Sequence, residues 1–273
     1  MLAAVMSNYG KDAMEPGFAA AEIDTSKPRP ARMYNAYLGG NGNYPADRAA
    51  VRQILRDFPE VRGIALANRA FLQRAAWFLA AEAGIRQFID IGTGIPSAGN
   101  VHEVAVRAAP DARVVYVDND PIVHVHANAL LTGSGTTGIV LADLRDPAAI
   151  RADPRVQELI DFSRPVALLL VAILHFIRDE EDPAGIVAAL RDALPDGSYL
   201  VLTHGTQDFH PPGGTATALT RLWQAPDDQL TAAGQQVTGI LKEKTDAAVP
   251  DDAASFVSVT RELAAGAHEA GGQ

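Results

Sequence analysis

The sequence predicts an α/β protein, built from a parallel sheet with helices on both faces and preceded by a helical segment. From Gln87 onward, short apolar runs alternate with polar turns and helical segments. The first three runs end at Asp90, Asp118 and Asp143, about 25 to 30 residues apart, which is the length of a strand plus a crossover helix. Near-continuous apolar strands that alternate with helices are typical of a parallel sheet buried on both faces.

The helical segment comes before the first apolar run. Apolar residues between Ala46 and Ala83 recur at helical spacing. We expect two helices here, separated near Pro59, with the second ending at Gly84. The stretch at residues 23–51 contains prolines and glycines that forbid one continuous helix, yet it is rich in tyrosine, arginine and asparagine.

Five strands are predicted after this segment. They are QFIDIG (Gln87–Gly92), RVVYVDND (Arg113–Asp120), GIVLADLRD (Gly138–Asp146), PVALLLVAIL (Pro165–Leu174) and SYLVLTH (Ser198–His204). The predicted organisation is therefore a flexible N-terminus at 1–22, a helical segment at 23–84 (called the cap below), an α/β core at 85–210 and a C-terminal segment at 211–273.

The turn after the first strand, in QFIDIGTGIPSAGNVHEV (Gln87–Val104), predicts a ligand site. Open parallel sheets bind ligands beyond the carboxyl ends of their strands. Gly92 and Gly94 lack the side chains that would keep a ligand away from the backbone, and the next helix directs its first amides to the same space. A nicotinamide site would have a third glycine where Ser97 stands, and a P-loop would have a lysine, so both are disfavoured.

Acidic residues at consecutive strand ends favour a nucleoside ligand without phosphates. Asp118 can accept hydrogen bonds from both hydroxyls of a ribose, and Asp143 can accept one from an adenine amino group. S-adenosylmethionine has both groups and no phosphate, and its amino-acid tail would reach the glycine turn. The alternative is that these glycines and acids only cap helices and strands.

The composition excludes several classes of protein. The formal net charge of −10 disfavours a nucleic-acid partner. The chain has no cysteine, so disulfides, thiolate metal sites and cysteine nucleophiles are excluded. The first residues do not have the pattern of a secretory signal, and Val166–Leu174 is far shorter than the roughly 18 residues that span a bilayer. We expect a soluble cytoplasmic protein with no membrane partner and no metal, which can form homo-oligomers.

Four segments carry a resemblance to a known family. They are DTSKPRPARMYNAYLGGNGNYPADR, ANRAFLQRA, RQFIDIGTGIPSAGNVHEVA and VVYVDNDPIV. From about Ile23 to about Asp208 the chain resembles an actinobacterial family of S-adenosylmethionine-dependent methyltransferases, long catalogued as a domain of unknown function. This resemblance implies a Rossmann-like class I methyltransferase core with an N-terminal helical cap, and S-adenosylmethionine as the cofactor.

The resemblance also implies roles for individual residues. Asp90, Gly92 and Gly94 would form the first methyltransferase motif. Asp118, with Asn119 beside it, would hold the ribose. The remaining residues implied to face the ligands are Asp143 and Leu144 at the adenine, and Arg32, Tyr37, Gly40, Asn41, Asn68 and Arg69 from the cap.

Two features differ from the expected pattern. Pro96 stands where many class I enzymes have a third glycine, which this family tolerates. The family usually closes its sheet with an antiparallel pair of strands, but the C-terminal segment offers only SFVSVT (Ser255–Thr260) as a short strand, and Leu230–Lys244 is predicted to be helical. The last edge of the sheet would then need another cover.

Methyl transfer needs a general base only when the acceptor must lose a proton. His175, after the fourth strand, and Tyr37, in the cap, are candidate catalytic residues, and His204 faces the ligand side from the fifth strand. Either histidine can instead cap a strand. His124 and His126 are two residues apart on a helix, which disfavours a metal site.

The sequence thus favours a methyltransferase that acts on a small molecule. The alternatives are a non-catalytic protein that binds S-adenosylmethionine or another nucleoside for regulation, and, less favoured, a nicotinamide oxidoreductase. The acceptor itself is not predicted by any motif.

Overall fold

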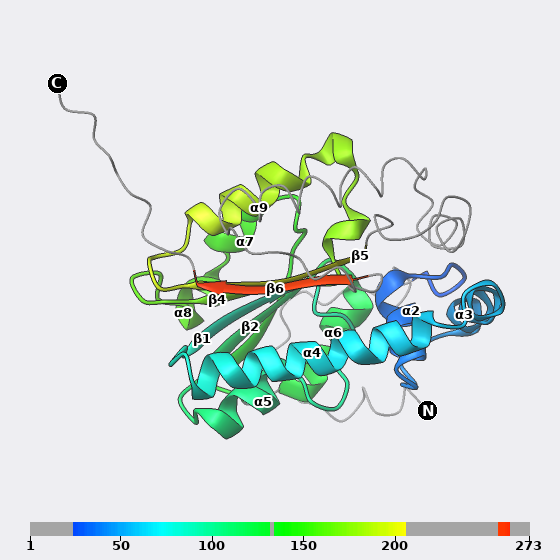
Figure 1. Cartoon of the computed structure of the whole chain (residues 1–273), viewed down its shortest axis with the longest axis horizontal. Helices are drawn as coiled ribbons and strands as arrows, with labels where there is room; N and C mark the ends of the chain where they lie inside the picture. Colours follow the sequence, from blue (N-terminus) through cyan, green and yellow to red (C-terminus); the bar gives the residue numbers. More distant parts are fainter. Residues whose placement is uncertain (1–23, 132–133, 206–255, 263–273) are drawn as a thin grey trace, which may run out of the picture.

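A computed structural model describes residues 24–131, 134–205 and 256–262 (Figure 1). Six strands form one sheet in the order β3-β2-β1-β4-β5-β6. The first five are parallel, and they confirm all five predicted strands: β1 (Gln87–Ile91), β2 (Arg113–Asp118), β3 (Thr137–Leu141), β4 (Ala167–Val171) and β5 (Tyr199–Gly205).

The sixth strand closes the edge that the sequence left open. Strand β6 (Phe256–Glu262) pairs antiparallel with β5 along its whole length, with Tyr199 opposite Glu262 and Gly205 opposite Phe256. The short strand predicted at Ser255–Thr260 is therefore present, and it covers the edge of β5 that the sequence analysis left open. The predicted helix at Leu230–Lys244 and the N-terminal residues 1–22 lie outside the described residues.

Among the described residues, three helices precede the sheet. The two predicted ones are α3 (Pro45–Asp57) and α4 (Val61–Ala81), which separate at Phe58–Glu60 as the proline at 59 requires. An additional helix, α2 (Pro30–Tyr37), starts with proline at its first position, where the missing amide costs nothing. We had not predicted α2, because the prolines and glycines around it obscure its short apolar pattern.

Helices cover both faces of the sheet. Helix α4, α5 (Val101–Ala108) and α6 (Pro121–Leu131) pack on one face through a cluster that includes Leu79, Val104 and Val114. The other face is covered by α7 (Pro147–Ala152), α8 (Pro154–Leu159) and α9 (Pro183–Asp192), together with the 3-10 turn η3 (Leu174–Phe176), while η4 (Asp179–Glu181) leads into α9. This double cover explains why the strands are apolar on both sides.

The carboxyl ends of the parallel strands and the N-terminal helices meet at one end of the molecule. In Figure 1, α2 and α3 stand beyond the ends of β1, β4 and β5, and α4 runs back along the sheet toward the start of β1. The strand order reverses between β1 and β4, and such a switch point is where open α/β sheets bind ligands. No helix in the described part of the chain is long and apolar enough to cross a membrane.

Candidate functional site

The turn after β1 bends through two glycines in the left-handed region. Gly92 has φ 75° and Gly94 has φ 67°, which favour glycine. The Gly92 amide donates to Val117 O at 2.8 Å and so binds the turn to β2. A Cβ on Gly92 would lie 2.6 Å from the side chain of Ile173, whereas a Cβ on Gly94 would have no neighbour within 4 Å. Gly92 therefore allows close packing, and Gly94 borders open space.

Two of the three predicted acids lie together beside this turn. Asp90 and Asp118 are buried and two residues apart in register, since Asp90 is opposite Tyr116 on β2. Asp118 Oδ2 accepts the Gly94 amide at 2.9 Å, and its Oδ1 accepts the Asp120 amide at 2.9 Å. A carboxylate has about four lone-pair positions, so Asp118 keeps acceptor capacity for a ligand.

Burial controls the protonation of both acids. It raises the pKa of Asp90 to about 7, against the opposing effects of the Arg69 charge and a hydrogen bond from Thr93. It raises the pKa of Asp118 to about 6, although the amides of Asp120 and Gly94 favour the ionised form. Two buried carboxyls with raised pKa values at one strand edge are typical of a functional site.

The third acid, Asp143, lies two residues after the end of β3 and is half-exposed. Asp143 Oδ2 accepts Asn119 Nδ2 at 2.8 Å, and Arg145 makes an ion pair with Oδ1 at 3.1 Å. Partial burial raises the pKa of Asp143, but hydrogen bonds from Arg145 and Asn119 outweigh it and hold the pKa below its usual value. The side chain of Leu144 is instead packed in the core under the sheet, so only its backbone is available to an adenine.

Helix α4 holds the second half of the turn. Arg69 donates from Nη2 to Ser97 O at 3.2 Å and to Asn100 Oδ1 at 2.9 Å. Gln73, one helical turn later, donates to Ala98 O and Gly99 O, both at 3.3 Å. Arg69 thus lies at the turn after β1, where its described contacts hold the loop in place.

Arg32 has a different position from the predicted one. It is 1% exposed inside the cap, with Nε 3.6 Å from Asp47 Oδ1 and its other nitrogens donating to Asp24 O and Lys27 O. These contacts join the start of α2 to α3, so Arg32 stabilises the cap, and its contacts among the described residues all lie within the cap. Asn41 is exposed at the tip of the loop after α2.

The glycine-rich loop of the cap packs against the turn after β1. Asn35 Oδ1 accepts the Gly42 amide at 2.9 Å and Asn43 Nδ2 at 3.0 Å, and a Cβ on Gly40 would collide with the Asn35 side chain. A Cβ on Gly42 would lie 2.9 Å from Ile95 Cγ2. The glycines of YLGGNGNY thus let the cap approach the turn closely.

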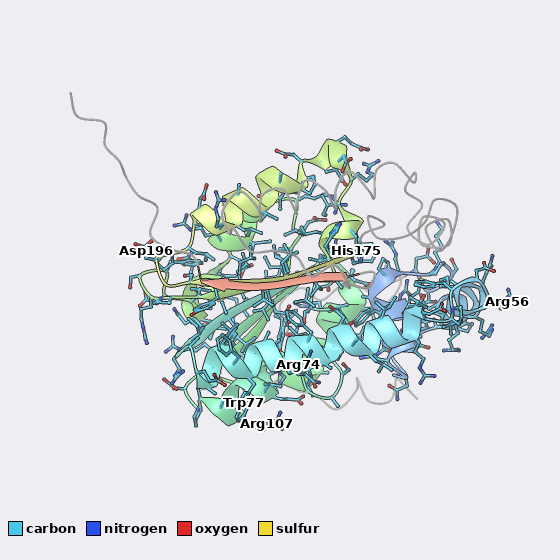
Figure 2. All side chains as sticks on the ribbon, viewed as in Figure 1. Arg56, Arg74, Trp77, Arg107, His175 and Asp196 are labelled. Carbon is cyan, nitrogen blue, oxygen red and sulfur yellow. The ribbon has the colours of Figure 1, made fainter. Side chains whose placement is uncertain are left out.

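Two predicted histidines form a buried pair. His175 in η3 and His204 in β5 have ring centroids 5.9 Å apart, and Figure 2 shows His175 near the end of the sheet beside the N-terminal helices. Burial lowers the pKa of His204 to about 4, and burial together with the His204 charge lowers that of His175, so both are neutral near pH 7. Within the described residues, neither ring nitrogen of His204 has a hydrogen-bond partner.

Tyr37 and Asn68 complete the predicted set. The Tyr37 hydroxyl is buried without a partner among the described residues, and burial raises its pKa. Asn68 bonds Tyr34 of the cap and Thr203 of β5. The structure therefore brings Asn68 and Thr203 together across the boundary between the cap and the sheet.

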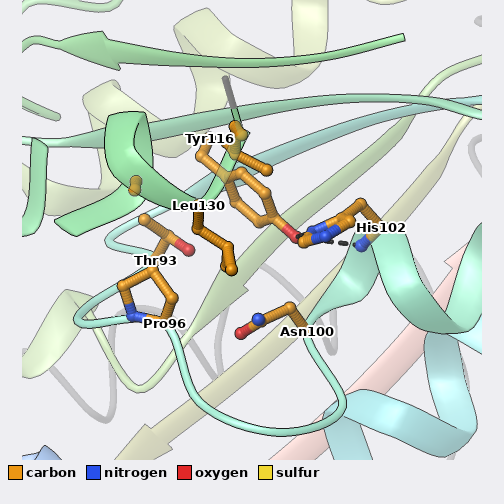
Figure 3. A pocket seen from close by; sticks show the side chains of 8 residues that line it. Thr93, Pro96, Asn100, His102, Tyr116 and Leu130 are labelled. Carbon is orange, nitrogen blue, oxygen red and sulfur yellow. Dashed lines mark hydrogen bonds between the residues drawn. The ribbon is translucent and has the colours of Figure 1, made fainter. Parts of the chain in front are cut away.

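A small pocket lies on the α5–α6 side of the turn, lined by residues that include Thr93, Pro96 and Leu130 (Figure 3). The Tyr116 hydroxyl accepts the His102 amide at 2.9 Å and bonds His102 Nδ1 at 2.8 Å. The polar groups of its wall thus bond one another, and we assign no ligand to this pocket.

The comparison with known families agrees with this geometry. Residues 16–233 match the family described as S-adenosyl methyltransferase. The chain belongs to this methyltransferase family. No curated protein sequence matches it.

Two solved structures are similar to this methyltransferase over most of its length. A DUF574 family protein from Streptomyces avermitilis is 43% identical, with 78% of this chain and 83% of that chain covered and a TM-score of 0.72. A methyltransferase candidate from Thermobifida fusca is 36% identical, with 88% and 97% covered and a TM-score of 0.73. An O-methyltransferase family protein from Burkholderia thailandensis, 15% identical with 77% and 62% covered and a TM-score of 0.50, shares the fold.

Several residues of the methyltransferase site were missed. Asn100 and Glu103 have the spacing of a helix-start capping box, but the Asn100 side chain does not cap the backbone of α5, and its Nδ2 instead donates to Glu103 Oε1 at 2.9 Å. That pattern was available in the sequence. Gln73 and Thr203 had no such signal, because their partners lie 26 and 135 residues away.

The two turn glycines of the methyltransferase should respond differently to alanine. Gly94→Ala adds only left-handed strain and should lower the free energy of unfolding by about 1 kcal/mol. Gly92→Ala adds the overlap with Ile173, so we expect a loss of about 2 to 3 kcal/mol. Denaturant unfolding of both variants measures the difference, and equal losses would show that Ile173 moves aside freely.

Proposed function

We propose that this protein transfers a methyl group from S-adenosylmethionine to a small-molecule acceptor. The main support for this proposal is the pair of buried carboxyls, Asp90 and Asp118, beside Gly94, whose backbone borders open space. The net charge of −10 and the cap over the strand ends support a small acceptor rather than a nucleic acid.

The residues present fit the cofactor. Asp118 has acceptor capacity left for ribose hydroxyls, and Gly94 leaves space for the chain of an amino acid next to Asp90. Asp143 and Asn119 supply hydrogen-bonding groups for the adenine. When bound, S-adenosylmethionine supplies an electrophilic methyl group on a cationic sulfur.

The acceptor side is assigned to the buried polar groups near the ends of β4 and β5. His204 carries two ring nitrogens without described partners, and His175 lies beside it. A neutral imidazole can accept a proton from a hydroxyl or amine as the methyl group arrives. Tyr37 offers a further hydroxyl, so these three side chains are the candidates for contact with the acceptor.

Two measurements test the proposal. Titration calorimetry should show binding of S-adenosylmethionine and no binding of NAD. Incubation with S-adenosylmethionine and a metabolite extract should then produce S-adenosylhomocysteine above the level without extract. Binding without turnover in any extract would favour the non-catalytic regulatory alternative, and NAD binding alone would contradict the proposal.

Cofactor affinity should depend on pH through Asp90. Its pKa of about 7 in the free protein means that half of it is protonated at that pH. The ionised carboxylate attracts the cationic ligand, so affinity should rise as the pH increases to about 7 and level off above it. In the free protein the same ionisation costs stability, which should fall as the pH rises from about 4 to about 7.

The control for this pH dependence is Asp90→Asn, which cannot ionise. Calorimetry of both proteins from about pH 5.5 to about pH 8.5 (about 1.5 units on each side of the transition) separates the contribution of Asp90 from that of the ligand's own amine. A rise of equal size in both proteins would contradict the assignment.

A further inference from the structure

The residue that follows β4 has a strained backbone. Ala172 has φ 56°, in the left-handed region that a residue with a Cβ rarely adopts. Its amide donates both to Thr203 O at 3.1 Å and to Thr203 Oγ1 at 2.9 Å. Strained conformations of this kind persist where the surroundings over-determine them, and they gather at functional sites.

The Thr203 hydroxyl connects this strained residue to the cap. It accepts the Ala172 amide and donates its own proton to Asn68 Oδ1 at 2.7 Å. Asn68 Nδ2 donates to the Tyr34 hydroxyl at 3.0 Å, and that hydroxyl donates to Ala65 O at 3.1 Å. Each hydroxyl and amide in this hydrogen-bond network donates to a single acceptor. The network therefore fixes the cap, β5 and the end of β4 relative to one another.

The same strained residue determines a contact with the turn after β1, which contains Gly92 and Gly94 and is called the cofactor turn below. Ile173 follows Ala172, and its side chain occupies the space that a Cβ on Gly92 would need, with Cδ1 2.6 Å from that position. A change in the backbone at Ala172 would redirect Ile173. The turn at Gly92 would then lose the surface against which it packs.

We propose that Thr203 and Asn68 are positioning residues for the cofactor turn. By holding Ala172 in its left-handed conformation, they place Ile173 against Gly92 and keep the turn in the shape that receives the cofactor. This inference rests on the proposed function for the identity of the ligand, but neither residue needs to touch the ligand.

Thr203→Val removes the hydroxyl and tests the proposal. We expect S-adenosylmethionine to bind about fivefold more weakly, as for the loss of one hydrogen bond. Amide hydrogen exchange at Gly92 and Gly94 should become faster, a readout that needs no ligand. Thr203→Ser keeps the hydroxyl and should behave as the unmodified protein. Thermal unfolding of each variant establishes that it is folded at the temperature of the assay.

Ala172→Gly is the decisive second change, because glycine adopts the left-handed conformation without help. In the Ala172→Gly background, Thr203→Val should change cofactor affinity by less than about twofold, because the glycine keeps the left-handed conformation without the Thr203 hydrogen bond. Tyr34→Phe is the graded comparison: it removes the hydroxyl that bonds Asn68 and Ala65 but leaves both bonds of the Thr203 hydroxyl in place, so affinity should fall less than in Thr203→Val.

Three results would overturn the inference. They are an unchanged affinity and exchange rate in Thr203→Val, an equal loss with and without Ala172→Gly, and an equal loss in Thr203→Ser. If the unmodified protein does not bind S-adenosylmethionine, the proposed function fails, and the exchange rates at Gly92 and Gly94 still decide whether Thr203 positions the turn.

Discussion

Replacing Asp47 with alanine is expected to lower the free energy of unfolding by about 3 kcal/mol. Asp47 is 0% exposed, lies 3.6 Å from Arg32 Nε and accepts the backbone amides of Arg29 and Tyr44. Arginine stays protonated in proteins, so the variant would leave the buried charge of Arg32 without its carboxylate.

The matched control is Asp57→Ala, the same change at an exposed position on the same helix. It should alter the free energy of unfolding by no more than about 0.5 kcal/mol. Urea unfolding followed by circular dichroism compares the two variants. Similar small losses would show that the cap does not depend on the Arg32–Asp47 pair.

Replacing Asp118 with alanine is expected to weaken S-adenosylmethionine binding by about 2 kcal/mol, or roughly thirtyfold. The variant removes an ionised acceptor from the predicted ribose site. It also leaves the Gly94 amide without the partner that it has at 2.9 Å, so the turn itself should loosen. Titration calorimetry measures the affinity directly.

Two further variants make the Asp118 result specific. Asp111→Ala removes an exposed acid before β2, at the opposite end of that strand, and should leave the affinity unchanged. Asp118→Asn keeps an oxygen for the Gly94 amide but loses the charge, so its loss should be intermediate. Full affinity in Asp118→Ala would contradict the assignment of this carboxylate to the ribose.

Much of the fold could be predicted because the sheet is buried on both faces. Each parallel strand is a continuous apolar run, and each ends in a polar turn, so the five strands and the glycine turn stand out without knowledge of their partners. The convergence of Asp90 and Asp118 followed from the rule that parallel strands end at one edge.

The details of the cap could not be predicted in this way. The pairing of Arg32 with Asp47 and of Asn68 with Thr203 depends on how helices pack after folding, which local periodicity does not encode. Only the family resemblance implied that Arg32 faces the pocket; its burial in the cap is possible because it has a carboxylate partner in Asp47. The burial of Leu144 likewise depends on which face of the loop turns under the sheet.

Helix α4 limits where the N-terminal helices can be removed or replaced in a chimeric protein. Its middle carries Asn68, Arg69 and Gln73, and its last turns fill the sheet face with residues such as Leu79. The helix is therefore not an exchangeable module. A truncation that starts at residue 85 would strip the sheet of a covering layer and expose its apolar surface to aggregation. Chimeras that graft a new lid should be joined between α3 and α4, at residues 58–60.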